Sequence, residues 1–266
     1  LSEFNPQEVT NTAWAFATVN YRDEKLFAAL AIAAERWLSE FNGQGLANTL
    51  WAFATVNYRD KKLFTALAIA AERQPSEFNP QEAANASWAF ATVNYRDEKL
   101  FAALAKAVER RLSEFNPQEV ANTAWAFATV NYRDEKLFAA LAIPAERQLS
   151  EFNGQGLANT AWAFATVNYR DEKLFSSLAS PVERRLSEFN PQNVANTTWA
   201  FARVSYRDEK LFAALAPAAE RRLSEFNPQA VANTAWAFAT VNYRDEQLFA
   251  ALAIAVERQL SEFNPQ

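Results

Sequence analysis

Two amide side chains recur at fixed places along this chain, and their chemistry suits molecular recognition. Gln7 and Asn11 lie four residues apart, and the same pair of positions returns every 37 residues. A carboxamide both donates and accepts hydrogen bonds, and the nearby indole of Trp14 offers a flat surface for stacking. Together these groups can bind the edge and the face of an unpaired base. The candidate binding residues are Gln7, Asn11, Gln44, Asn48, Gln81, Asn85, Gln118, Asn122, Gln155, Asn159, Gln192, Asn196, Gln229 and Asn233.

Each of these positions also has a structural interpretation. A helix that is packed between neighbours buries its large side chains, so we expect Trp14 and its equivalents in the core between repeats. The Asn residues could equally tie the loop of one repeat to the next, because buried amides need hydrogen-bond partners. Gln7 lies in a first helical turn, where it could be solvated or could cap the helix locally. The sequence leaves binding and structural roles open for both amide positions.

One arginine per repeat forms a second candidate set. Arg22 precedes Asp23 in a turn, and a column of such cations could contact successive phosphates. The alternative is a local ion pair with the adjacent aspartate, which cancels most of the far field. A single further charge, Arg203, lies in line with the amides, where other repeats have Thr. The candidate phosphate-binding residues are Arg22, Arg59, Arg96, Arg133, Arg170, Arg207 and Arg244.

Catalytic and metal chemistry has little support in the composition. The chain has no Cys and no His, which removes thiol nucleophiles, imidazole bases and zinc sites that use these ligands. The carboxylates occupy helix-end or exposed positions in every repeat, and no Gly-rich phosphate loop follows a strand. We therefore expect no catalytic residue, no metal, no cofactor and no enzymatic activity. A net charge of -5 argues against a strong nonspecific field for nucleic acid and would suit a basic peptide.

The elements that position these residues follow from the period. The Trp at position 14 of the first unit returns six more times without a gap, and a fixed period in this range is typical of solenoids. We predict an all-α protein, an α-solenoid of about seven antiparallel two-helix repeats. The array is expected to be continuous over residues 1–266, with repeats that start near 1, 38, 75, 112, 149, 186 and 223 and a partial eighth from 260.

The first unit shows where each helix should begin and end. Asn5 is a good N-cap, Pro6 suits the first helical position, and Glu8 completes a capping box. The first helix should run to about Val19, and the following Asn is a good left-handed C-terminal residue. Asp23 should cap a second helix that continues to about Leu38. Because the connections are short, the two helices must be antiparallel neighbours.

The helical period divides the first helix into two faces. At 100° per residue, Gln7, Asn11, Trp14 and Thr18 fall on one stripe, which we call the amide stripe, and Val9, Ala13 and Phe16 fall on the opposite side. The apolar face is expected to be core. Glu35-Arg36 and its equivalents on the second helix are predicted to be a solvated face.

Two departures from the consensus carry structural predictions. The second and fifth repeats share Gly-Gln-Gly-Leu at residues 43–46 and 154–157, where other repeats carry Pro-Gln, which suggests duplication of a three-repeat block. Three later repeats place Pro144, Pro181 and Pro217 inside the second helix. Each proline removes a backbone donor and costs about 3 kcal/mol in a straight helix, so we predict kinked or shortened helices there.

The repeat resembles a known group of helical arrays. The pattern Asn-Pro-Gln-x-x-Ala-Asn-Thr-x-Trp-Ala-Phe-Ala, then about ten residues to Leu-Phe-x-x-Leu, is similar to octotricopeptide repeats of algal organelle proteins and to 37-residue heptatricopeptide repeats. The latter occur with FAST-kinase-like leucine-rich regions and RAP domains, and similar arrays occur in RNA-editing substrate-binding proteins. The resemblance implies an α-solenoid that binds single-stranded organellar RNA and acts in RNA processing, stability or translation. It implies a chloroplast or mitochondrial location.

Two other functions remain open. An armadillo-like scaffold would use Asn and Trp ladders to hold an extended peptide or protein partner, and a spacer would bind nothing. No apolar run is long enough for a membrane span, and no targeting segment is evident, so we expect no membrane partner. The chain begins and ends within a repeat, which predicts a segment of a longer protein.

Overall fold

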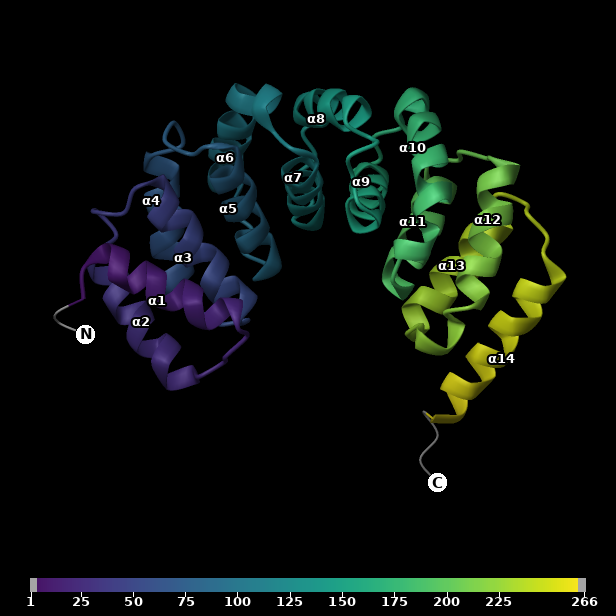
Figure 1. Ribbon diagram of the computed structural model, residues 1–266, viewed down its shortest axis with the longest axis horizontal. Helices are drawn as coiled ribbons and strands as arrows, with labels where there is room; N and C mark the ends of the chain where they lie inside the picture. Colours follow the sequence, from purple (N-terminus) through teal and green to yellow (C-terminus); the bar gives the residue numbers. More distant parts are fainter. Residues whose placement is uncertain (1–3, 263–266) are drawn as a thin grey trace. The chain divides into compact units, whose positions relative to one another are not determined.

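The computed structural model describes residues 4–262 and is helical, with no strand in that range (Figure 1). Every predicted repeat contributes two α-helices. Their bounds are α1 Pro6–Thr18, α2 Glu24–Arg36, α3 Gly43–Thr55, α4 Lys61–Arg73, α5 Pro80–Thr92, α6 Glu98–Arg111, α7 Pro117–Thr129, α8 Glu135–Arg147, α9 Gly154–Thr166, α10 Glu172–Arg185, α11 Pro191–Arg203, α12 Glu209–Glu220, α13 Pro228–Thr240 and α14 Glu246–Glu262. Short 3₁₀ turns follow α6, α10 and α12: η1 Leu112–Glu114, η2 Leu186–Glu188 and η3 Leu223–Glu225. The all-α prediction is confirmed, and the last four residues of the predicted partial eighth repeat lie outside the described range.

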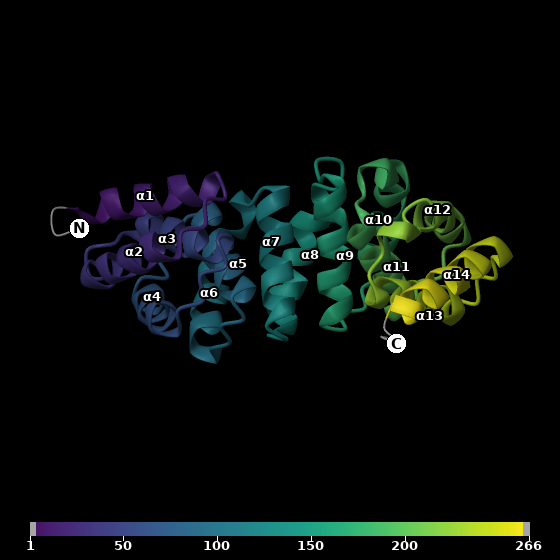
Figure 2. The same cartoon turned by 90° about the horizontal axis from the view of Figure 1, so that it is seen from below.

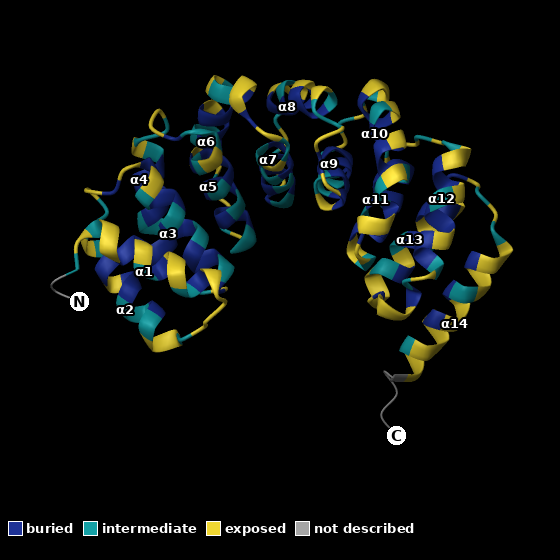
Figure 3. Ribbon diagram, in the orientation of Figure 1, coloured by how far each residue is buried: buried dark blue, intermediate teal, exposed yellow. Residues whose placement is uncertain are grey.

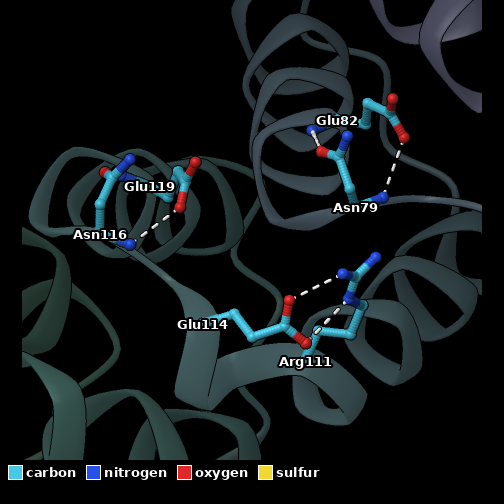
Figure 4. Close-up of polar contacts among 6 residues, drawn as sticks. All are labelled: Asn79, Glu82, Arg111, Glu114, Asn116 and Glu119. Atoms are coloured by element: carbon cyan, nitrogen blue, oxygen red, sulfur yellow. Dashed lines mark hydrogen bonds and ion pairs between the residues drawn. The ribbon is translucent and has the colours of Figure 1, made fainter.

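The helix ends follow the predicted capping chemistry. The side chain of Asn5 accepts a hydrogen bond from the Glu8 amide at 2.9 Å, and the Glu8 carboxylate accepts one from the Asn5 amide at 2.8 Å. Figure 4 shows the same box at α5 and α7, from Asn79 with Glu82 and from Asn116 with Glu119. Each box satisfies amides that would otherwise lack partners at the helix start.

The turn between the two helices is left-handed at one residue, as predicted. Asn20 has φ 53°, and its equivalents in the other repeats fall between 57° and 62°. Asn tolerates this region better than most side chains, and Ser205 occupies it in the sixth repeat. Asp23 then caps α2 by accepting from the Leu26 amide at 2.9 Å.

The odd-numbered and even-numbered helices form two layers within each of two compact units. In the first unit, residues 4–141, α1, α3, α5 and α7 pack side by side, and α2, α4 and α6 form the second layer. In the second unit, residues 142–262, α9, α11 and α13 form one layer and α10, α12 and α14 the other. Figure 1 separates the layers, with α6 above α5 in the first unit and α10 above α11 in the second, and Figure 2 shows the helices from below.

The core of each unit lies between its layers and joins consecutive repeats. Phe27 of α2 packs edge-on against Phe53 of α3, with ring centroids 5.4 Å apart, and both side chains are buried. The same contact between phenylalanine rings recurs at four further steps, each inside one unit, with ring centroids 5.2 to 6.1 Å apart. Figure 3 shows the buried residues on the facing sides of the layers. The apolar face predicted from Val9 and Ala13 is therefore confirmed as core.

The prolines do not break their helices. Pro144 and Pro181 lie inside α8 and α10, which are 13 and 14 residues long, so the predicted shortening is wrong there. The Pro217 helix, α12, has 12 residues and ends one residue earlier than the equivalent helices α2, α4 and α8, so the predicted shortening is confirmed there. The carbonyls of Pro144 and Pro217 still accept hydrogen bonds from residues four positions later, because proline removes a donor but keeps its acceptor.

The predicted solvated face is confirmed for Arg36 and its equivalents, which are exposed, but is wrong for Glu35 and most of its equivalents, which are half-buried. The Glu35 carboxylate accepts a hydrogen bond from Lys62 of the next repeat at 2.6 Å, and its side chain is 22% exposed. Equivalent Lys–Glu pairs join Lys136 to Glu109 within the first unit and link two further steps in the second, Lys173–Glu146 and Lys210–Glu183. A second pair holds the start of the next repeat: Arg111 is bidentate to Glu114 at 2.7 and 3.0 Å (Figure 4).

Candidate nucleic-acid interface

The glutamines of the amide stripe lie at the surface of the odd-numbered helices. All seven, from Gln7 to Gln229, are exposed. None makes a side-chain hydrogen bond within residues 4–262. The local cap at each helix start is made by Asn, as at Asn5, so the capping role considered for Gln7 is not observed there.

The asparagines of the stripe are half-buried, apart from the exposed Asn11. Their amides form no hydrogen bond with another group in the described part of the chain, and none of their polar atoms is sealed from solvent without a partner. The predicted alternative, in which Asn11 and its equivalents tie one repeat to the next, is therefore wrong for this structure. Asn48, Asn85, Asn122, Asn159, Asn196 and Asn233 are left with donors and acceptors that only solvent or a ligand can use.

The tryptophans are not core residues, which corrects the expectation from their size. Trp14 and Trp236 are 46% and 43% exposed, and the five between them are half-buried. The rings of Trp14 and Trp51 lie 6.4 Å apart at an angle of 36°. Because the apolar side of each helix is filled by Phe, Ala and Leu, the indole remains at the edge of the stripe with part of its face open.

The threonines at the C-terminal end of the amide stripe offer few groups that a ligand could contact. The Thr18 hydroxyl donates to the Trp14 carbonyl at 2.8 Å, and the hydroxyls of Thr55, Thr92, Thr129 and Thr166 are buried without a hydrogen-bond partner. Such covered groups cannot reach a ligand. Arg203 is exposed at the end of α11. The accessible chemistry of the stripe is therefore that of Gln, Asn and Trp.

In the described range, the candidate phosphate-binding arginines do not form the predicted ion pair with the adjacent aspartate. The Nε of Arg22 donates to the side-chain oxygen of Asn20 at 2.9 Å, and the same bond measures 2.7 to 3.0 Å in the next four repeats. Among the described residues, no ion pair joins these arginines to the adjacent aspartates, and Asp23 serves as a helix cap. The seven arginines are exposed. Where this bond forms, the guanidinium is held at one edge and its terminal nitrogens stay available.

The turns of successive repeats enclose pockets that sequence reasoning missed. A pocket of about 410 Å³ is lined by Arg22, Asp23, Glu24, Tyr58, Arg59 and Asp60. Equivalent pockets of about 650 and 370 Å³ include Tyr132 and Tyr206, respectively. The sequence contains a signal for these pockets, because Tyr-Arg-Asp-Glu recurs in most repeats. Only the packing of one repeat on the next shows that two copies of the motif line the same pocket.

Each of the three pockets contains a tyrosine whose pKa is raised. Burial, with smaller contributions from nearby carboxylates such as Asp60 and Glu24, raises the pKa of Tyr58. The same causes raise the pKa of Tyr132 and of Tyr206. Each phenol therefore stays protonated at neutral pH and can donate a hydrogen bond.

Within residues 4–262, no helix is both long enough and apolar enough to cross a bilayer. A search of curated protein sequences found no significant match. A family model does match: residues 2–263 fit the model of the RNA-editing substrate-binding complex 6 protein. The match spans nearly the whole repeat array, so the chain belongs to the RNA-editing substrate-binding complex 6 protein family.

Proposed function

We propose that this chain binds RNA through the amide stripe of each unit, as a non-catalytic component of RNA editing. The observation that carries the proposal is the asparagine column: half-buried amides that form no hydrogen bond with any other described residue, repeated on successive helices of one layer. An unused amide at a partly buried place is costly unless solvent or a ligand completes its hydrogen bonds. The exposed Gln and the open indole edge beside it supply further base contacts.

The family match supports the same function. Its name describes an RNA-editing substrate-binding complex, and the substrate of RNA editing is RNA. This favours RNA over the peptide partner that the acidic charge allowed. Within RNA function, we propose single-stranded RNA as the ligand, because unstacked bases are what amide and aromatic groups can recognise.

Two finer assignments belong to the proposal. The relation to octotricopeptide and heptatricopeptide repeats rests on the resemblance of the motif, and the family match is compatible with it. We propose the mitochondrion as the location, since the RNA-editing family agrees with that organelle and gives no support to the chloroplast.

The test uses two asparagines of the second unit and a matched control. In the variant Asn159→Ala with Asn196→Ala, we expect affinity for single-stranded RNA to fall roughly tenfold or more, since each base contact is worth about 1 to 3 kcal/mol. Ser180→Ala, an exposed change on α10, should leave affinity unchanged. Fluorescence anisotropy with four labelled homopolymers measures both, and the nearly uniform stripe should prefer one of the four.

The proposal fails if no homopolymer binds at low salt, or if the double variant binds like the control. Unfolding midpoints decide whether a loss is specific. Because neither these amides nor Ser180 makes a side-chain hydrogen bond among the described residues, and Ala favours a helix, neither variant should unfold at a lower denaturant concentration than the parent chain.

A further inference from the structure

The pockets between successive turns form a second repeated site, separate from the amide stripe. Each lies between two consecutive repeats and takes an arginine from both: Arg22 with Arg59, Arg96 with Arg133, and Arg170 with Arg207. The first two lie in the first unit and the third in the second unit. A site that recurs with the period of the array is suited to a ligand that is itself a repeating polymer.

The charge of the pockets argues against a phosphate and against a simple cation. The first contains two guanidinium groups and three carboxylates, those of Asp23, Glu24 and Asp60. The second contains three cations and four carboxylates, and the third two of each. An isolated phosphate would be repelled by the carboxylates, and a lysine side chain by the guanidinium groups.

The directions of the hydrogen-bonding groups favour a neutral ligand with both donors and acceptors. Asn20 and Asn57 hold the Nε of Arg22 and Arg59, which leaves the terminal nitrogens as fixed donors. Glu24 is exposed and makes no hydrogen bond or ion pair among the described residues, so both its oxygens can accept. Tyr58 adds a half-buried ring and a hydroxyl beside them.

Among nucleobases, guanine fits this arrangement best. Its N1 and N2 donors point in parallel and match the two oxygens of a carboxylate, and its O6 and N7 acceptors match the fork of a guanidinium. Adenine, cytosine and uracil all lack the parallel pair of donors, because each presents only one donor group on its Watson–Crick edge. We propose that each pocket between adjacent turns binds an unstacked guanine of an RNA strand, between an arginine donor and a glutamate acceptor. This inference rests on the proposed RNA-binding function.

The test neutralises the acceptors without changing shape. The variant Glu24→Gln, Glu98→Gln, Glu172→Gln alters one carboxylate in each pocket, and the control Glu40→Gln, Glu77→Gln, Glu225→Gln makes the same change of charge at exposed residues outside them. The probes are a labelled oligouridine and the same oligomer with spaced guanosines, read by anisotropy. A third probe carries inosine, which lacks the N2 donor.

We expect the parent chain and the control to bind the guanosine oligomer roughly tenfold more tightly than oligouridine, because a bidentate contact discriminates against a base that cannot form it. Inosine and the pocket variant should each remove most of that preference, while affinity for oligouridine stays unchanged. If the pocket variant instead binds both oligomers more tightly than the control, the pockets take phosphate and the inference is wrong. Equal binding of both oligomers by the parent also overturns it, whereas failure of every oligomer to bind would overturn the RNA-binding function itself.

Discussion

In the first five repeats, the asparagine that follows the first helix performs two tasks in the turn. Asn94 adopts φ 59°, which reverses the chain after α5, and its side-chain oxygen accepts from Arg96 at 2.9 Å. A residue that is chosen for its backbone conformation therefore also orients the cation beside the pocket. Ser205 keeps the conformation in the sixth repeat at φ 62°.

Replacing Asn94 separates these two tasks. Asn94→Val should lower the free energy of unfolding by about 1 to 2 kcal/mol, because a β-branched side chain is strained in the left-handed region. Asn94→Gly loses the same hydrogen bond to Arg96 without that strain, so its loss should be clearly smaller. Urea denaturation of the two variants checks the difference, and equal losses would show that the hydrogen bond, not the backbone, carries the stability.

At the scale of the element, both local capping residues and packing against the next repeat determine how each helix begins. Caps begin α1 at Pro6 and α5 at Pro80, and in the Gly repeats the cap survives without its returning glutamate. Gly154 shows why that exception persists: its amide donates to Glu188 at 2.8 Å, and an added Cβ would lie 2.9 Å from the Glu188 side chain. Together with the arginine Arg185, the Gly154 amide lowers the pKa of the Glu188 carboxyl, with the backbone hydrogen bond the larger cause.

The proline inside α10 gives a prediction at this scale. Pro181→Ala restores a backbone donor in a helix that already continues to Arg185, and five of the six other repeats carry Ala at this position. We expect the free energy of unfolding to rise by about 1 to 3 kcal/mol. Pro191→Ala at the first residue of α11 is the control, and it should change stability by less than about 1 kcal/mol because no helical hydrogen bond is missing there. Thermal and urea unfolding measure both, and a destabilised Pro181→Ala would mean that the ring's packing outweighs the lost bond.

At the scale of the molecule, an acidic chain that binds RNA must rely on few phosphate contacts. The net charge is -5, and carboxylates lie beside the arginines of the turns. Base contacts with Asn and Gln release no counterions, so affinity should depend weakly on salt. This distinguishes the chain from basic proteins that hold the phosphate backbone.

We therefore expect the logarithm of RNA affinity to fall with the logarithm of salt concentration with a slope of about -1.4 to -2.1, as for two or three phosphate contacts to a single strand. Anisotropy titrations across a salt series give the slope directly. A slope steeper than about -4 would contradict recognition through bases and point to the arginines as the main contact.

The sequence by itself determined the period, the helix type, the caps, the left-handed turn and the apolar face. These follow from interactions within a few residues, such as Asn5 with Glu8, or from the spacing of Val9 and Ala13 on one helix. Only the tertiary structure decided which side chains remain available. Trp51 is half-buried instead of core, Glu35 joins Lys62 of the next repeat, and Tyr58 meets Arg22 across a pocket, because each outcome depends on the distance between neighbouring repeats. Repetition makes every copy of a residue alike in sequence, and stacking against the next repeat gives that residue its contacts.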